Sequence, residues 1–197
     1  MIRDVLIWPD PRLKEKAKEV SVVDAAVRKL IDDMFETMYS EDGVGLAAPQ
    51  LGASQRIVVI DTNPKPDPDK PQSPICLINP VLVGGKGEIV WNEGCLSVPG
   101  EFEDVDRFDT ITVRALNREG RPFEITDATG LLAIALQHET DHLDGTMFVD
   151  RLSTLKREVI RRRMKRLKAE VEETGLHPKE ILREREEAEA AQIENAI

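Results

Sequence analysis

The chain has 197 residues, of which 41% are hydrophobic, so it can form one compact domain with a real core but is too short for two ordinary domains. Its formal net charge is −10, only two cysteines occur, and nothing at the N-terminus resembles a secretory signal, so the reducing cytoplasm is the expected location. No apolar run approaches the roughly 20 residues that span a bilayer, so we expect no membrane partner. We also expect no DNA partner.

The first predicted element is an amphipathic helix between Val23 and Tyr39, preceded by a proline-rich turn at residues 9–11. Its apolar residues recur at steps of three and four, which places them on one stripe of a helix. They are Val27, Leu30, Ile31, Met34, Phe35 and Met38. We interpret this helix as core packing without a chemical role.

Five short segments with β-branched or alternating apolar residues, bounded by turn formers, predict strands. They cover residues 56–61, 75–79, 88–91, 110–116 and 123–126. Residues 62–74, between the first two, contain five prolines, which cannot donate backbone hydrogen bonds. This segment is therefore predicted to be an exposed loop.

A second helix is expected to begin near Asp127–Gly130 and to end at Gly145. Its positions 131, 134, 135, 138 and 142 are separated by three, four or seven residues, so they share one face. The residues on that face are Leu131, Ile134, Ala135, His138 and His142.

The C-terminal part separates into a basic and an acidic half. Residues 156–168 carry eight Lys and Arg residues and one acidic residue, whereas residues 169–197 carry nine Glu and three basic residues. A third helix is predicted to run through the basic stretch until Gly175 and Pro178 interrupt the helical signal. We therefore expect a main domain over residues 1–155 and a charged helical extension over residues 156–197.

The most informative segment is His138-Glu139-Thr140-Asp141-His142. Two histidines at positions i and i+4 of a helix can bind one metal ion, with Glu139 beside it. The alternative interpretation is a chance pairing of histidines on one helix, and the apolar residues before the segment favour a buried, walled site instead.

Two histidines leave a catalytic metal short of a protein ligand, since such sites generally keep three protein ligands and one exchangeable water. Cys95, in Glu93-Gly94-Cys95-Leu96-Ser97, could supply a thiolate as the third ligand. Taken alone, Cys95 is better explained as an inert buried cysteine, which is how we interpret Cys76.

A third segment, Gly43-Val44-Gly45-Leu46-Ala47-Ala48-Pro49-Gln50, combines two glycines with a side-chain amide. The glycines permit unusual backbone angles or the close approach of another chain. The Gln50 amide could donate a hydrogen bond to an oxyanion. The spacing does not match a phosphate-binding glycine-rich loop.

In this order, the three segments resemble the three motifs of peptide deformylases, with the last motif continuing as Leu143-Asp144-Gly145. The resemblance extends from Pro9 to about Leu155. It implies an α+β fold in which antiparallel or mixed β-sheets surround the helix with the histidine pair. It also implies that Cys95, His138 and His142 bind the metal, with Fe²⁺ as the physiological ion and Zn²⁺, Ni²⁺ or Co²⁺ able to replace it.

The resemblance further implies hydrolysis of the formyl group from the N-terminal formylmethionine of nascent polypeptides. In such a mechanism Glu139 transfers the proton, while the Gln50 amide and the Leu96 backbone N–H stabilise the oxyanion. The substrate backbone is expected to pair with Val44, Gly45 and Gly100 like an added strand. A further set of residues is expected to line the pocket for the methionine side chain: Leu131, Ile134, Ala135, Val44 and Trp91.

Two features outside the motifs support hypotheses of their own. Arg107 is expected to pair with Asp141 or Glu93 behind the metal. The basic residues 156–168 could bind ribosomal RNA near the emerging chain, or could form a solvated helix that pairs with the acidic end. The sequence assigns no function to the acidic tail after Glu170.

Two alternatives to a deformylase remain at this point. The His-Glu-x-x-His helix is shared with metallopeptidases that cut internal peptide bonds, although a third ligand of Cys is unusual for them. A metal-binding, ribosome-associated protein without turnover is the other alternative, and the presence of Glu139 and Gln50 argues against it.

Overall fold

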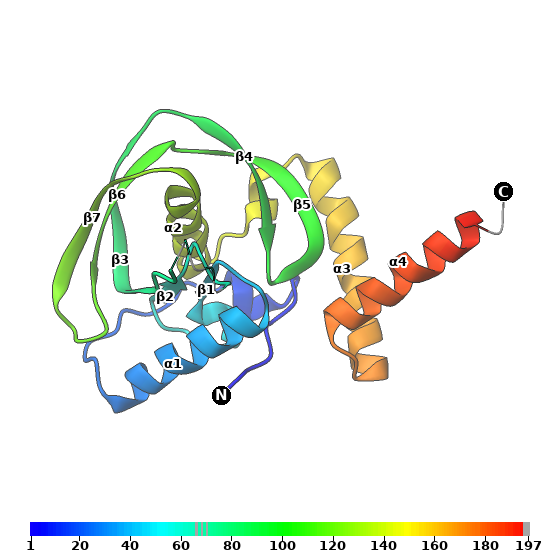
Figure 1. Cartoon of the computed structure of the whole chain (residues 1–197), viewed down its shortest axis with the longest axis horizontal. Helices are drawn as coiled ribbons and strands as arrows, with labels where there is room; N and C mark the ends of the chain where they lie inside the picture. The colour runs from blue at the N-terminus through cyan, green and yellow to red at the C-terminus, as the bar shows by residue number, and fades with distance from the viewer. Residues whose placement is uncertain (66, 68, 70, 195–197) are drawn as a thin grey trace.

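The computed structural model describes residues 1–194 apart from 66, 68 and 70, with the backbone alone at 192–194. Two β-sheets surround helix α2 (Gly130–Leu143), while α1, α3 and α4 lie outside them (Figure 1). This arrangement confirms the predicted α+β class, with a central helix that carries both motif histidines.

The strands form one sheet of five, in the order β1-β2-β3-β6-β7, and a separate hairpin of β4 and β5. Their bounds are β1 Gly45–Ala47, β2 Ile57–Ile60, β3 Ile75–Lys86, β4 Ile89–Cys95, β5 Val98–Arg107, β6 Thr110–Leu116 and β7 Pro122–Ala128. All pairings between these strands are antiparallel. The hairpin pairs Ile89 with Arg107 at its open end and Cys95 with Val98 at its turn.

All five predicted strands are present, and β6 has the predicted bounds, but two strands were not predicted. Strand β1 has only three residues, too few for a periodic signal. Strand β5 is rich in acidic residues, which are depleted in strands, although its buried Val105 and Arg107 alternate with an exposed Asp106. Strand β3 continues to Lys86 because it pairs with β6 along that length.

Helix α1 (Ala25–Ser40) follows the predicted apolar stripe. It begins at Ala25 because the Asp24 side chain accepts a hydrogen bond from Val27 N at 2.9 Å and so caps the helix. The stripe packs into a core cluster with residues of β1, β2 and β3, including Leu46, Ile57 and Ile78. Helix α1 thus packs against the five-stranded sheet at β1, β2 and β3, and it is drawn below these strands in Figure 1.

Helix α2 lies inside the molecule and packs against β1, β2, β3 and β6. Every residue from Ala133 to Leu143 except Asp141 is buried, so the histidines sit in the core rather than at the surface. Gly145 follows the helix with a φ of +71°, and a Cβ there would lie 2.4 Å from the Lys14 carbonyl oxygen. Glycine at 145 is required both by the turn and by this close approach.

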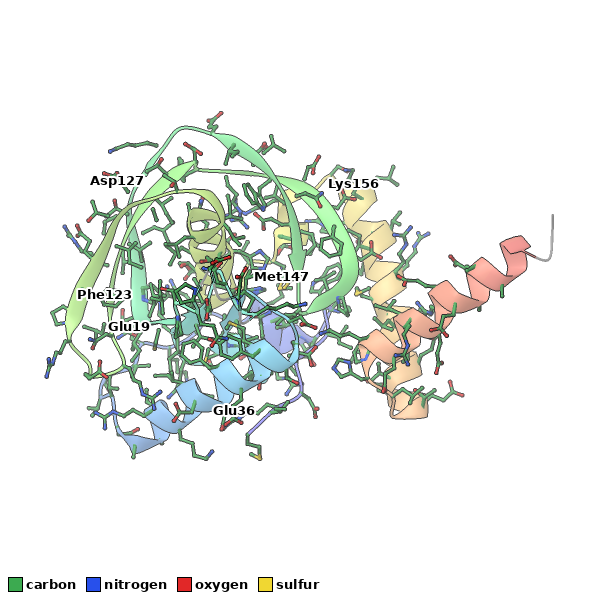
Figure 2. The ribbon with its side chains drawn as sticks, viewed as in Figure 1. Glu19, Glu36, Phe123, Asp127, Met147 and Lys156 are labelled. Carbon is green, nitrogen blue, oxygen red and sulfur yellow. The ribbon has the colours of Figure 1, made fainter. Side chains whose placement is uncertain are left out.

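Helices α3 (Thr154–Thr174) and α4 (Pro178–Glu194) form the predicted extension, and the predicted break between them is confirmed. Gly175, with a φ of +71°, ends α3. The apolar side of α3 joins a core cluster with the N-terminal segment, including Ile7 and Trp8. Its outer side carries exposed charge: in Figure 2 Lys156 projects from α3, whereas Met147 lies buried inside the molecule.

The described part of the proline-rich loop, residues 62–65, 67, 69 and 71–74, contains no helix or strand, and its described residues from 65 onward are exposed. Residues 66, 68 and 70 of that prediction lie outside the described residues. Within the part of the chain that the structure describes, we find no helix with the length and apolarity needed to cross a membrane.

Candidate active site

The three predicted metal ligands converge on one point. His138 and His142 lie one turn apart on α2, and Cys95 is the last residue of β4. The Nε2 atoms of the two histidines are 3.2 Å apart, and Cys95 Sγ lies 3.3 Å from His142 Nε2. The donor atoms of all three residues lie within 4.8 Å of one another.

These distances fit a single metal ion. Imidazole nitrogens bind zinc at about 2.0–2.1 Å, so two of them at tetrahedral corners are about 3.3 Å apart. The observed separation of 3.2 Å between the histidine Nε2 atoms matches this geometry. Three soft or borderline ligands that face one point are the donor set of a divalent transition metal.

His138 is held in orientation by a buried carboxylate. Its Nδ1 lies 2.8 Å from Glu93 Oε2, and because a carboxylate only accepts, the Nδ1–H is the donor. This bond leaves Nε2 of His138 free to face the other ligands. Burial alone would raise the pKa of Glu93, but hydrogen bonds from Arg107 and His138 lower it to about 2.

Arg107 joins two motifs behind the ligands. Its Nη2 donates to Glu93 Oε2 at 2.8 Å and its Nη1 to Asp141 Oδ2 at 2.6 Å. The side chains of Arg107 and Glu93 are each only 2% exposed. The expected pairing of Arg107 is therefore confirmed for both partners, and it connects β4 and β5 to α2.

Glu139 is the acid next to the metal ligands, and it is buried in the same cavity. Burial raises the pKa of Glu139 to about 7. Its Oε2 has no hydrogen-bond partner among the described residues, which is unusual for a buried carboxylate oxygen. The carboxylate has room only because position 45 is glycine: a Cβ there would lie 2.5 Å from Glu139 Oε1.

Gln50 is fixed beside Cys95. Its Oε1 accepts a hydrogen bond from Ala47 N at 2.8 Å, and its Nε2 donates to Ser97 Oγ at 3.2 Å. The same Nε2 lies 3.5 Å from Cys95 Sγ. The amide donor therefore faces the ligand set, next to Leu96 in the turn between β4 and β5.

A cavity of about 780 Å³ borders this centre and is lined by Cys95, His138, Glu139 and Gln50. Its size is that of a site for a small peptide or drug-sized ligand rather than for one side chain. All of the predicted substrate-binding residues line it: Val44, Gly45, Gly100, Leu131, Ile134, Ala135 and Trp91. The sequence motifs, separated by up to about a hundred residues along the chain, therefore share one cavity.

Two contributions to the site were not predicted. The hydrogen bond from His138 to Glu93 joins positions 45 residues apart, and no local pattern encodes such a contact. The far end of the cavity is lined by residues of the C-terminal extension, among them Leu176 and Leu182. The sequence signal there was only a charged tail with a helix break.

Comparison with known proteins agrees with this site. The model of the polypeptide deformylase family matches residues 2–158. The peptide deformylase of Alkalilimnicola ehrlichii is 51% identical over 166 residues, which is 84% of this chain and 90% of that protein. The one from Pseudomonas aeruginosa is also 51% identical and covers 84% of this chain and 95% of its own length.

Solved structures show the same fold. A peptide deformylase from Legionella pneumophila has a TM-score of 0.79 and 48% identity, covering 86% of this chain and 96% of its own. The Ehrlichia chaffeensis enzyme in complex with actinonin has a TM-score of 0.77 and 40% identity, covering 84% of this chain and 96% of its own.

These matches span Cys95, His138, His142 and the catalytic motifs, and they decide against the metallopeptidase and the non-catalytic alternatives. The chain belongs to the polypeptide deformylase family, the metallohydrolases that remove the formyl group from the N-terminus of nascent peptides.

Proposed function

We propose that Glu139 is the proton carrier of deformylation in this chain, working beside a metal ion held by Cys95, His138 and His142. The observation that carries this proposal is the buried Glu139 carboxylate, with an oxygen that lacks a partner among the described residues, in the cavity that Cys95 and His138 also line. A carboxyl group with a pKa of about 7 can both accept and return a proton near neutral pH.

The donor set supports a divalent transition metal. When bound, such an ion lowers the pKa of coordinated water to about 7 and polarises a carbonyl oxygen. We propose Fe²⁺ as the physiological ion, which the family resemblance favours, and one thiolate with two imidazoles also suits Zn²⁺, Ni²⁺ and Co²⁺. A ferrous thiolate centre needs a reducing environment, which supports the expected cytoplasmic location.

The residues around the metal site can transfer the proton of the attacking water and stabilise the negative charge that develops on the substrate. Glu139 takes a proton from the attacking water, whose oxygen bonds to the formyl carbon. Negative charge then develops on the formyl oxygen, where the Gln50 Nε2–H and the Leu96 backbone N–H can donate hydrogen bonds. When the bond from carbon to nitrogen breaks, Glu139 delivers the proton to the leaving amine, which yields formate and a free N-terminus.

The cavity supports the expected mode of substrate binding. Gly45 of β1 and the preceding Val44 border it on one side, and Gly100 of β5 borders it on the other, so an extended peptide between the two strands can pair with backbone on either side. Leu131 and Ile134 line the same cavity from α2 and supply apolar surface for the methionine side chain. All of these residues belong to the proposed catalytic domain, residues 1–155.

The decisive experiment measures formate release from formyl-Met peptides by anaerobically prepared, ferrous-loaded protein and its Glu139→Ala variant. We expect the variant to keep its metal, because all three ligands remain, and to lose activity by about 10²–10⁴-fold. Unchanged turnover by a metal-loaded Glu139→Ala protein would remove Glu139 from the mechanism. Metal content measured on the same samples separates loss of the proton carrier from loss of the ion.

We also propose that the basic face of α3, within residues 156–168, binds ribosomal RNA. Several of its cations pair with acids of the main domain, including Lys156 with Glu103 and Arg163 with Glu101. Arg162 and Lys165 are exposed and have no ion-pair partner among the described residues. These two remain available for phosphate groups.

Co-sedimentation with ribosomes tests this binding. Replacing both Arg162 and Lys165 by Glu should abolish sedimentation, and added salt should weaken the binding of the parent chain, because phosphate contacts release counterions. Equal sedimentation of the parent and the double variant would reject the role of this face.

A further inference from the structure

The C-terminal extension forms part of the substrate cavity. The far end of the cavity is lined by Val171 at the end of α3, by the turn at residues 175–177 and by the start of α4, including Leu182. All of these residues follow residue 158, where the family match ends. The extension therefore adds a wall to the cavity that the catalytic motifs do not supply.

Ion pairs hold this wall against one side of the cavity. His177 Nε2 lies 3.0 Å from Glu41 Oε1, and Lys179 Nζ lies 3.2 Å from Glu41 Oε2. Lys179 Nζ also donates to the Glu41 backbone oxygen at 2.7 Å. Glu41 follows α1 directly and its side chain is only 13% exposed, so the turn is fixed next to the segment that leads into β1.

Apolar packing holds the wall against the other side. Leu182 lies next to Gly100 of β5, so close that a Cβ at position 100 would be 3.0 Å from Leu182 Cδ1. Ile181 is 5% exposed and belongs to the core cluster shared by α3 and the N-terminal segment. The segment 175–182 thus spans from Glu41, at the end of α1, to Gly100 of β5.

The surface offered to a ligand here is apolar. Leu176 is 36% exposed and Phe102 of β5 is 66% exposed, and both line the cavity together with Leu182. Phe102 lies over Gly94, where a Cβ would come within 2.5 Å of its ring. The polar side chains of His177 and Lys179 are engaged with Glu41, so Leu176 and Leu182 remain as the contact surface that this segment offers.

We propose that residues 175–182 form a specificity wall that contacts the second and third residues of the formylated peptide and selects apolar side chains there. The ligand of this wall is the substrate peptide, because the wall lines the same cavity as Cys95 and His138. A peptide with its formyl group at those residues extends along the cavity toward the wall. An exposed apolar surface inside a peptide cavity is a contact for apolar side chains.

A charge placed in the wall tests the proposal. Formate release by the full chain is measured on three peptides, formyl-Met-Leu-Leu, formyl-Met-Ser-Ser and formyl-Met-Lys-Lys. We expect the parent chain to prefer the Leu peptide, and Leu176→Glu to shift the ratio of kcat/KM between the Leu and Lys peptides by about tenfold or more toward Lys. Leu182→Lys should instead shift it away from Lys, an opposite change that general damage to the fold would not produce.

Leu155→Glu is the matched control, because Leu155 is 77% exposed on α3 and does not line the cavity. It should leave the ratio as in the parent chain. Ratios in Leu176→Glu and Leu182→Lys that equal the control would overturn the proposal. The inference rests on the deformylase activity, and its failure can be told apart from failure of that activity. If the chain is not a deformylase, no peptide releases formate. If the wall does not contact the peptide, all variants release formate with the same ratio between peptides.

Discussion

Gly45 lies directly against the carboxylate of Glu139. A Cβ at position 45 would be 2.5 Å from Glu139 Oε1, and within 2.9 Å of the Cδ and Cγ atoms of the same side chain. The absence of a side chain at position 45 thereby lets β1 approach α2 and leaves room for the Glu139 carboxylate. Glycine at 45 is explained by this contact and not by an unusual backbone angle, since Gly45 is not among the residues with positive φ.

Gly45→Ala should therefore reduce activity without removing the metal. The added methyl group must displace the Glu139 carboxylate, and a misplacement of about 1 Å costs about a hundredfold in rate. Formate release and metal content, measured on the same preparation, check this. Gly84→Ala is the control because a Cβ at Gly84 meets nothing within 4 Å, and an equal loss in both variants would contradict the explanation.

Arg107→Leu should strongly destabilise the fold. The substitution removes the guanidinium group that pairs with both Glu93 and Asp141. Glu93, whose side chain is only 2% exposed, is then a buried carboxylate that has lost its cationic partner. We expect the free energy of unfolding to fall by about 3–5 kcal/mol, measured by denaturant titration at constant metal occupancy.

The matched control for Arg107 is Arg114→Leu. Arg114 pairs with Glu124 on the surface and is 68% exposed, so its loss should cost less than about 1 kcal/mol. Similar costs for the two substitutions would show that burial of the Arg107 network contributes little.

Asp10→Asn should destabilise the protein in a pH-dependent manner. Hydrogen bonds from Arg12, with Lys168 nearby, hold the pKa of Asp10 well below its usual range. The ionised form therefore adds stability that is fully present above the ordinary carboxyl pKa of about 3.9 and is lost as the pH falls through the lowered value. Because Arg12 is 55% exposed and solvent screens the pair, we expect a loss of about 1 kcal/mol at neutral pH.

Thermal unfolding of the parent chain and Asp10→Asn over a pH series measures this effect. The difference in stability should be constant from neutral pH to about pH 5 and should shrink only in more acidic solution. A difference that does not depend on pH would mean that the substitution acts through packing instead of charge.

Removal of the metal should expose one cysteine to alkylation and leave the other protected. Cys95 lines the cavity, and if it binds the metal as proposed, a chelator that removes the ion should leave its thiolate open to iodoacetamide. Burial raises the pKa of the Cys76 thiol to about 12, so almost none of it is thiolate at neutral pH. Peptide mapping after alkylation should find Cys95 modified only in the chelated protein, and modification of Cys76 in folded protein would contradict its assigned environment.

The sequence by itself determined the local features of this protein. The apolar spacing of α1, the bounds of β6, the break at Gly175 and the histidine pair of α2 follow from periods of two or of three to four residues and from turn chemistry. His138 and His142 share one face of any helix that contains them, so their role was accessible before the fold was known. The motif resemblance then indicated Cys95, Gln50 and Glu139.

The tertiary structure alone decided how distant segments meet. The short β1 and the acidic β5 have weak intrinsic signals and are fixed by their pairing partners. The contact of Glu93 with His138, the position of Gly45 under Glu139 and the wall at residues 175–182 each join parts of the chain that no period relates. Such contacts depend on which surfaces pack together once the core forms, and packing is a property of the whole fold rather than of any local run of residues.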